Sequence, residues 1–312
     1  MSLTKMWHWL SMNTLFATLL ILAVPLAVSV LLFLHALSTS HPTVVLKTRR
    51  RYSPTHLLIV LGSGGHTAEM LSMLRRLPLD PTLYTYRTYV VSSGDGFSAS
   101  KVVEFEKTLR QKRERKGGLD ESGICSEDTP RLEPEQLHRL NENFTDVAIP
   151  GSYIVITVPR ARRVHQSFWT APFTTVKCFW ACLNILRGVH VEQRSCPKTM
   201  IPRYPDLILT NGPATGVCIV LAAKLIRLLR YVSTSLNVWY PAVLSLYEGQ
   251  APTPYPLRTV FVESWARVTS LSLSGKILLP FVDRFLVQWP SLRGKRAWRG
   301  MKESEFVGTL VE

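Results

Sequence analysis

Residues 56–67, with the sequence HLLIVLGSGGHT, decide how this chain folds. The first six residues are mostly apolar, and they are followed by a turn that contains three glycines. A helical pattern starts near Thr67, because apolar side chains then recur three and four residues apart. Those apolar residues are Met70, Leu71, Leu74 and Leu77. The stretch therefore predicts a buried strand, a tight glycine turn and an amphipathic helix in succession.

Five more apolar runs continue this strand-then-helix order along the chain. They are Arg87–Val91, Tyr153–Val158, Asp206–Thr210, Thr259–Val262 and Arg284–Gln288. Helical patterns follow three of these strands, at 101–110, 169–186 and 217–229, and we expect the second to be a buried helix. Continuous apolar runs, rather than alternating ones, are typical of parallel strands covered on both faces. We predict an α/β fold with a doubly wound, Rossmann-like parallel sheet over residues 56–290.

The composition is that of a folded protein with an anionic partner. Hydrophobic residues make up 46% of the 312 positions and charged residues 19%, so the chain is able to bury a core and is not disordered as a whole. Lys and Arg outnumber Asp and Glu by 37 to 22, which suits a membrane surface, a phosphorylated ligand or nucleic acid. Five scattered cysteines predict reduced core thiols rather than a disulfide scaffold or a zinc site.

An uncharged segment near the N-terminus predicts a membrane anchor. Residues 15–37 read LFATLLILAVPLAVSVLLFLHAL, and no charged side chain occurs from Met6 to Leu46. As a helix the run reaches ~34 Å, enough to cross a hydrocarbon core of ~30 Å. A cleaved signal peptide is the alternative, although its apolar region usually spans only ~7–15 residues. We predict an uncleaved single-span anchor.

Flanking charge sets the orientation of this anchor. Only Lys5 precedes the span, whereas four basic residues follow it: Lys47, Arg49, Arg50 and Arg51. The positive-inside tendency therefore leaves residues 1–14 as a short lumenal N-terminus, 38–55 as a basic juxtamembrane linker and the main domain in the cytosol.

Two stretches of the main domain are predicted to be insertions, at 111–147 and 231–257. The first begins inside a basic run, turns acidic after residue 116 and carries few apolar residues, which is typical of a solvated loop. A nucleic-acid patch is the alternative interpretation, but aromatic residues are not interleaved with the basic ones, so we predict no nucleic-acid partner. The second insertion contains four prolines and is expected to lie on the surface.

The glycine turn is a candidate anion site. Its residues are Gly62, Ser63, Gly64, Gly65 and Thr67. Glycines allow a ligand to approach the backbone, and the free N–H groups of the following helix attract negative charge. The turn lacks the third glycine of the dinucleotide fingerprint and the Gly-Lys-Ser/Thr of a P-loop, so a plain strand-to-helix turn remains the alternative. His66 is its only titratable side chain, and it either bonds to local backbone or assists a ligand hydroxyl.

Five blocks in this order carry a resemblance to a known family. They are HLLIVLGSGGHTAEMLSML (56–74), PRAR (159–162), PDLILTNGPATG (205–216), VESWARVTSLSLSGK (262–276) and DRFLVQWP (283–290). Behind an N-terminal anchor, this set resembles the membrane-anchor subunit of the UDP-N-acetylglucosamine transferase of the dolichol pathway, the Alg fourteen family. The matching blocks span about residues 56–290.

The resemblance implies a split glycosyltransferase of the GT-B type. This chain would be the acceptor-side half, similar to the N-terminal domain of the bacterial transferase MurG, and would be inactive alone. A soluble partner of the Alg thirteen family would carry UDP-GlcNAc, and the pair would add the second GlcNAc to dolichyl-diphosphate-GlcNAc at the cytosolic face of the endoplasmic reticulum membrane. The C-terminal tail, 291–312, would take part in docking the partner. The resemblance implies no further cofactor and no metal.

The resemblance also suggests roles for residues at the strand ends. His66 corresponds to a histidine in the same loop of MurG-like enzymes and is the candidate for assisting the acceptor hydroxyl. Glu263 is a rival base, or it orients the sugar or caps the next helix. Arg160 and Arg162 are candidate contacts of the acceptor diphosphate. Ligand or partner contacts are also predicted for a second loop, for which a plain turn role is equally open: Asn211, Gly212 and Thr215.

Two other functions remain open at this point. In one, the chain is a pure scaffold that recruits a catalytic partner and touches no substrate. In the other, it is a self-sufficient membrane-bound enzyme that uses a nucleotide, against which the single domain and the missing fingerprint both count.

Overall fold

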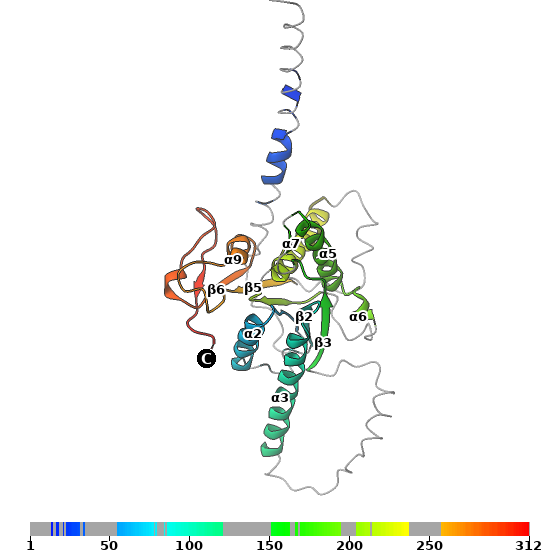
Figure 1. Ribbon diagram of the computed structural model, residues 1–312, viewed down its shortest axis with the longest axis vertical. Helices are drawn as coiled ribbons and strands as arrows, with labels where there is room; N and C mark the ends of the chain where they lie inside the picture. Colours follow the sequence, from blue (N-terminus) through cyan, green and yellow to red (C-terminus); the bar gives the residue numbers. More distant parts are fainter. Residues whose placement is uncertain are drawn as a thin grey trace, which may run out of the picture.

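Figure 1 shows the computed structural model of the chain. It describes residues 55–77, 79, 84, 86–120, 151–162, 166, 167, 169–194, 204–212, 214–236 and 257–311, together with the helical residues 14, 17, 18, 21, 23–31 and 34. No helix within these residues is long and apolar enough to cross a membrane. In the segment predicted to be an anchor, 15–37, every described position is helical and exposed, and the other ten of its 23 residues lie outside the description.

The core of the protein is a seven-stranded parallel sheet in the order β3-β2-β1-β4-β5-β6-β7. The strands are β1 (His56–Val60), β2 (Tyr86–Ser92), β3 (Ser152–Val158), β4 (Leu207–Thr210), β5 (Arg258–Val262), β6 (Arg284–Val287) and β7 (Glu305–Phe306). All six strands predicted from apolar runs are confirmed. The seventh was missed because two residues are too few to form a recognisable pattern.

Helices cover both faces of the sheet, as predicted for a doubly wound fold (Figure 1). One layer contains α2 (Gly65–Arg76) and α3 (Gly96–Asp120); the other contains α5 (Ala171–Leu186), α7 (Ala214–Leu236) and α9 (Leu273–Leu278). Shorter elements are α6 (Val191–Arg194) and the 3-10 turn η2 (Pro290–Leu292). Successive residues of β1 serve the two faces: Leu57 and Ile59 pack in the α2–α3 cluster, and Leu58 and Val60 in the α5–α7 cluster.

The two predicted insertions begin as helix. α3 continues to Asp120, so residues 111–120 are helical and the prediction of a loop there was wrong. Lys, Arg, Gln and Glu are good helix formers, and α3 is already anchored at its first half, where Glu106 accepts two hydrogen bonds from the buried Arg87 at 2.7 and 2.8 Å. α7 likewise continues to Leu236. Residues 121–147 and 237–256 lie outside the described residues.

The prediction of a buried helix at 169–186 holds for only one side of α5. Cys178, Cys182, Ile185 and Leu186 are buried against the sheet and α7. A second set of large apolar side chains points into solvent: Trp169 (87% exposed), Phe173 (73%), Val176 (66%) and Trp180 (63%). Their spacing of three and four residues places them in one stripe along the helix, with the last turn before α5 included. Composition alone did not reveal this stripe, since both sides of the helix are apolar.

The predicted core thiols are confirmed for the three cysteines that the structure describes. Cys178, Cys182 and Cys218 are buried and free. The other two, Cys125 and Cys196, lie outside the described residues.

The C-terminal segment packs against the domain. β7 extends the sheet beside β6, and Leu310 and Val311 join the α2–α3 cluster. The Leu310 N–H donates to the Gln288 side chain at 3.0 Å, and Arg76 donates to the Thr309 carbonyl at 3.0 Å. Residues predicted to be a tail therefore reach back towards the end of β6.

Candidate functional site

The predicted site residues lie in loops at one edge of the sheet. Because every strand pair is parallel, the carboxyl ends of all strands face the same edge. The segments there are the glycine loop (62–67) after β1, 93–95 after β2, 159–162 after β3, 211–212 with the start of α7 after β4, and 263–265 after β5. Ligands of doubly wound proteins bind at this edge, so the topology supports the predicted location.

The glycine loop has the backbone geometry of an open helix N-terminus. Gly64 is the N-cap of α2 and has φ 60° and ψ −118°, a conformation that residues with a Cβ rarely adopt. Since Gly64 has no side chain, no side-chain oxygen caps the helix, and the first turn contains no acidic residue. A Cβ at Gly64 or Gly65 would meet no atom within 4 Å, so the space beside the loop is open among the described residues.

Thr67 stabilises this loop from inside. Its buried hydroxyl donates to the Gly62 carbonyl and lies 2.7 Å from the Ser98 hydroxyl. Ser98 in turn donates to Asp95 at 2.6 Å, which ties the glycine loop to the loop after β2. The backbone N–H of Thr67 also donates within the loop, to the Gly64 carbonyl at 3.1 Å. Both donors of Thr67 therefore hold the loop together, and its contact with a ligand stays a prediction.

The loop after β4 closes on the glycine loop. A Cβ at Gly212 would lie 3.1 Å from the backbone nitrogen of Gly62, tighter than an ordinary van der Waals contact, so glycine favours this close approach. Asn211 is buried beside it, and its amide donates to the His66 carbonyl at 2.8 Å. The Oδ1 atom of Asn211 has no hydrogen-bond partner within the described residues. The structure thus brings Asn211 and Gly212 to the glycine loop, and their contacts fix the backbone at His66.

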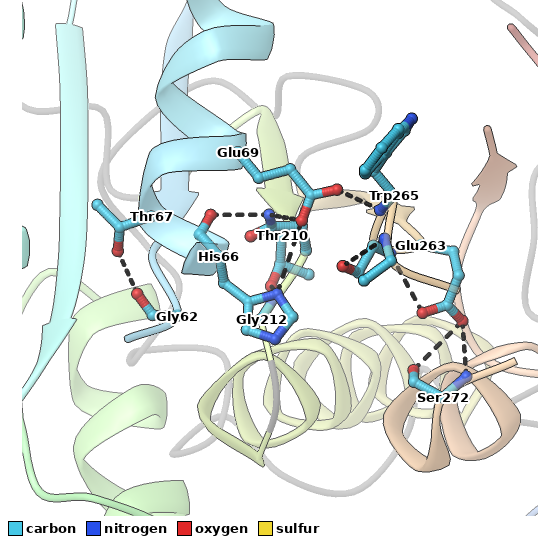
Figure 2. A network of polar contacts seen from close by, with 12 residues as sticks. Gly62, His66, Thr67, Glu69, Thr210, Gly212, Glu263, Trp265 and Ser272 are labelled. Carbon is cyan, nitrogen blue, oxygen red and sulfur yellow. Dashed lines mark hydrogen bonds and ion pairs between the residues drawn. The ribbon is translucent and has the colours of Figure 1, made fainter. Parts of the chain in front are cut away.

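His66 lies in the first turn of α2, with 36% of its side chain exposed. Its Nδ1 atom lies 3.8 Å from Oε2 of Glu69, within range for charge attraction but too long for a hydrogen bond. Figure 2 shows the ring below the Glu69 carboxylate. The imidazole is therefore held beside the open loop and remains accessible.

Sequence reasoning missed Glu69, which is buried at the centre of this edge. Its carboxylate accepts hydrogen bonds from the Trp265 N–H and, at 3.1 Å, from the Gln288 amide. Burial alone would raise the pKa of Glu69, but the His66 side chain, the Trp265 N–H and further donors favour the charged form and lower the pKa below its usual value. The available signal was its position three residues after His66 on one helix face.

Glu263 faces a different neighbour. Its buried carboxylate accepts from the backbone N–H of Ser272 at 3.1 Å and from the Ser272 hydroxyl at 3.2 Å, at the N-terminus of α9. It leaves no room for a side chain at Gly275, and Figure 2 shows it pointing towards Ser272. Burial raises the pKa of Glu263 despite these bonds. This arrangement suits the capping role and separates Glu263 from His66.

The remaining candidates contact neighbouring loops. The Arg160 guanidinium donates to the carbonyl groups of Ser93 at 2.8 Å and Gly94 at 3.3 Å, after β2. Arg162 donates to the Gln166 carbonyl at 3.4 Å. The Thr215 hydroxyl lies 2.9 Å from the Ser92 hydroxyl, which joins α7 to β2. Arg160 and Thr215 therefore stabilise the shape of the edge whether or not they touch a ligand.

These features define a class of protein: a Rossmann-like domain whose carboxyl edge presents an open glycine loop and an accessible histidine. The chain belongs to the family described as "Oligosaccharide biosynthesis protein Alg14 like", whose model matches residues 57–126 and 124–310. The predicted family is thereby confirmed.

Several curated relatives are similar over most of this chain. One from Aspergillus fumigatus is 51% identical over 253 residues, which is 78% of this chain and 100% of that protein. One from Schizosaccharomyces pombe is 35% identical and covers 82% of this chain and 83% of its own, and a human relative is 29% identical with 82% of each covered. All three are named UDP-N-acetylglucosamine transferase subunit Alg14. No solved structure matches the chain.

Proposed function

We propose that this chain is the membrane-anchored, acceptor-side subunit of a UDP-GlcNAc transferase that adds the second GlcNAc to dolichyl-diphosphate-GlcNAc. The observation that carries the proposal is the open glycine loop with His66 beside it, in a chain whose relatives are named subunits of such a transferase. A diphosphate suits the loop, because the N-terminus of α2 attracts anions and glycine lets them approach.

His66 has a defined role in this proposal. Its Nδ1 faces Glu69, so Nε2 is the nitrogen that remains for the acceptor sugar. Nε2 accepts the proton of the acceptor hydroxyl while that oxygen bonds to the anomeric carbon of GlcNAc and the bond to UDP breaks. Glu263 is the weaker candidate, because its carboxylate is already occupied by Ser272. Arg160 and Arg162 are second contacts for the diphosphate at the same edge.

The donor sugar is assigned to a second chain. A GT-B transferase needs two Rossmann-like domains facing a cleft, and this chain provides one sheet within its described residues. A soluble partner of the Alg thirteen family would bind UDP-GlcNAc. Segment 15–37 would hold the complex at the endoplasmic reticulum membrane, where a lipid-linked acceptor is confined to the same surface.

Reconstitution tests this division of labour. Transfer from UDP-GlcNAc to a lipid-diphosphate-GlcNAc acceptor is measured in membranes with this chain alone, the candidate partner alone, and both together. We expect activity only with both. Activity of this chain alone would show a self-sufficient enzyme and contradict the half-enzyme proposal.

The exposed stripe of α5 is assigned to the bilayer in the same proposal. α5 begins at the carboxyl edge, where the Thr174 and Thr175 hydroxyls donate to the Ala161 carbonyl at 2.8 and 3.1 Å. Trp169 and Phe173 therefore lie towards the edge that holds the glycine loop. Aromatic residues favour the interfacial region of a membrane, and the exposed Lys177 suits anionic head groups. This contact would keep the candidate site close to the lipid-linked acceptor.

Lipid contact by α5 predicts a fluorescence result. In vesicles made with brominated acyl chains, we expect Trp180→Phe to reduce the quenched part of the tryptophan emission of the full chain. The matched control is Trp298→Phe, which removes a half-exposed tryptophan outside the stripe and should leave the quenched part unchanged. Equal quenching in Trp180→Phe and the unsubstituted chain would exclude contact at this position.

A further inference from the structure

Glu69 joins four separate segments at the carboxyl edge. The residue belongs to α2 and is only 8% exposed. Its Oε1 atom accepts from the Trp265 N–H after β5 and from the Gln288 amide after β6. Its Oε2 atom faces the Asn211 amide at 3.4 Å and His66 Nδ1 at 3.8 Å. One carboxylate thus connects the glycine-loop helix to the ends of three strands.

The two oxygens of Glu69 have different surroundings. Oε1 is bound by a backbone N–H and by Gln288, whose amide also donates to the Glu263 carbonyl at 3.1 Å and whose oxygen accepts from Leu310. These contacts fix the orientation of the carboxylate plane. Oε2 is left facing His66 and the longer contact from Asn211. The carboxylate is therefore fixed on one side and directed at the imidazole on the other.

The negative charge of Glu69 affects which ring nitrogen of His66 carries the proton. Within the described part of the chain, His66 is the sole basic side chain within ion-pair distance of Glu69, and neither lysine nor arginine forms an ion pair with it. Burying a carboxylate without such a partner is unfavourable unless hydrogen bonds compensate. A negative charge opposite Nδ1 favours the tautomer that carries its proton there and stabilises the imidazolium that forms when Nε2 takes a second proton.

We propose that Glu69 is a positioning residue for His66: it holds the proton on Nδ1 and so leaves Nε2 as the acceptor of the substrate proton. The inference rests on the proposed function for its catalytic meaning, whereas the tautomer itself is a property of this chain alone. Asn211 supports the same geometry from the backbone side, because its amide binds the His66 carbonyl. Gln288 acts one step further away by orienting Glu69.

The first test is the tautomer of His66 in the full chain in lipid nanodiscs, read from ¹⁵N histidine spectra. The signal is assigned by its loss in His66→Ala. In the unsubstituted chain we expect the neutral ring to carry its proton on Nδ1. Glu69→Gln should shift the population towards the Nε2–H form, and Glu69→Asp should retain more of the Nδ1–H form. A proton on Nε2 in the unsubstituted chain would overturn the inference without any variant.

The second test is transfer by the assembled complex. We expect Glu69→Gln to lower kcat at least ~10-fold while KM for UDP-GlcNAc and co-purification of the partner stay unchanged, in keeping with loss of general-base efficiency. Glu106→Gln is the matched control: it removes another buried carboxylate, on α3, whose partners are Arg87 and Tyr89. It should lower stability and leave both the His66 spectrum and kcat unchanged.

The two tests separate this inference from the proposed function. Normal kcat and an unchanged His66 spectrum in Glu69→Gln, together with loss of activity in His66→Ala, would overturn the positioning role and leave the transferase subunit in place. A wild-type complex that fails to transfer GlcNAc would remove the proposed function, while the spectra would still decide whether Glu69 sets the tautomer. Equal loss of kcat in Glu69→Gln and Glu106→Gln, with no spectral change, would reduce Glu69 to a structural role.

Discussion

Replacing His66 with alanine is expected to lower GlcNAc transfer by the assembled complex roughly 10²–10⁴-fold, the usual contribution of a general base. The imidazole is accessible beside the open loop, whereas the alternative base, Glu263, is buried after β5 and bound to Ser272. The Asn211 amide donates to the backbone carbonyl of His66, and this hydrogen bond helps to fix the edge. Alanine at position 66 has the same carbonyl, so the substitution leaves the hydrogen bond in place. The fold and partner binding should therefore survive, and the loss should appear in kcat.

A second histidine provides the control for this variant. His190 lies beyond the end of α5 and outside the loops of the candidate site, with Nδ1 4.0 Å from Glu192. His190→Ala should leave the rate of transfer unchanged. Rates are compared at equal amounts of complex, established by co-purification of the partner from membranes. Near-normal transfer by His66→Ala with the partner bound would remove His66 from the active site and favour the pure scaffold.

The sheet could be predicted from the sequence because each strand is recognisable from a few consecutive residues. Each of the six predicted strands is a short continuous apolar run, and burial on both faces leaves little other reason for such a run. The location of the site follows from the same argument, since parallel strands place their carboxyl ends at one edge. β7 gives no comparable signal, because its two residues pair with β6 only after the chain has returned from 293–304.

The contacts within the site could not be predicted in the same way. Glu69 meets Asn211, Trp265 and Gln288 across 142, 196 and 219 residues of sequence, so no local pattern connects them. Glu263 was recognised as a candidate from its place at a strand end, but its direction depends on α9, which has only six residues. A strand-end position identifies which residues can meet a ligand, and the packing of the next helix decides which of them do.

The exposed side of α5 could not be predicted from the amino-acid composition of the helix. The apolar run 169–186 predicts a helix, yet apolar residues line both its buried side and its exposed side. In an aqueous protein the second apolar side would be expected to find a partner within the fold. A bilayer removes this conflict, and the quenching experiment on Trp180 tests that explanation directly.

Substituting alanine for Gly64 is expected to raise KM for the lipid-linked acceptor about tenfold or more while leaving KM for UDP-GlcNAc unchanged. A Cβ at this residue meets no neighbour, so any effect must come from the backbone, where φ 60° and ψ −118° cost a residue with a side chain about 1–3 kcal/mol. The loop relieves this strain by rotating the peptide at the N-terminus of α2. That rotation turns away the N–H groups proposed to bind the diphosphate.

Gly188→Ala is the control that distinguishes the effect of backbone strain from a role of the glycine loop in binding. It also has a positive φ, 68°, but lies after α5, outside the loops of the candidate site, and its N–H donates to the Ile185 carbonyl at 3.0 Å. Gly188→Ala should lower the free energy of unfolding by a similar amount and leave both KM values unchanged. If the two variants affect acceptor KM equally, the glycine loop has no special role in binding. A selective effect of Gly64→Ala would place the diphosphate at the loop, because stability alone would not discriminate between two strained glycines.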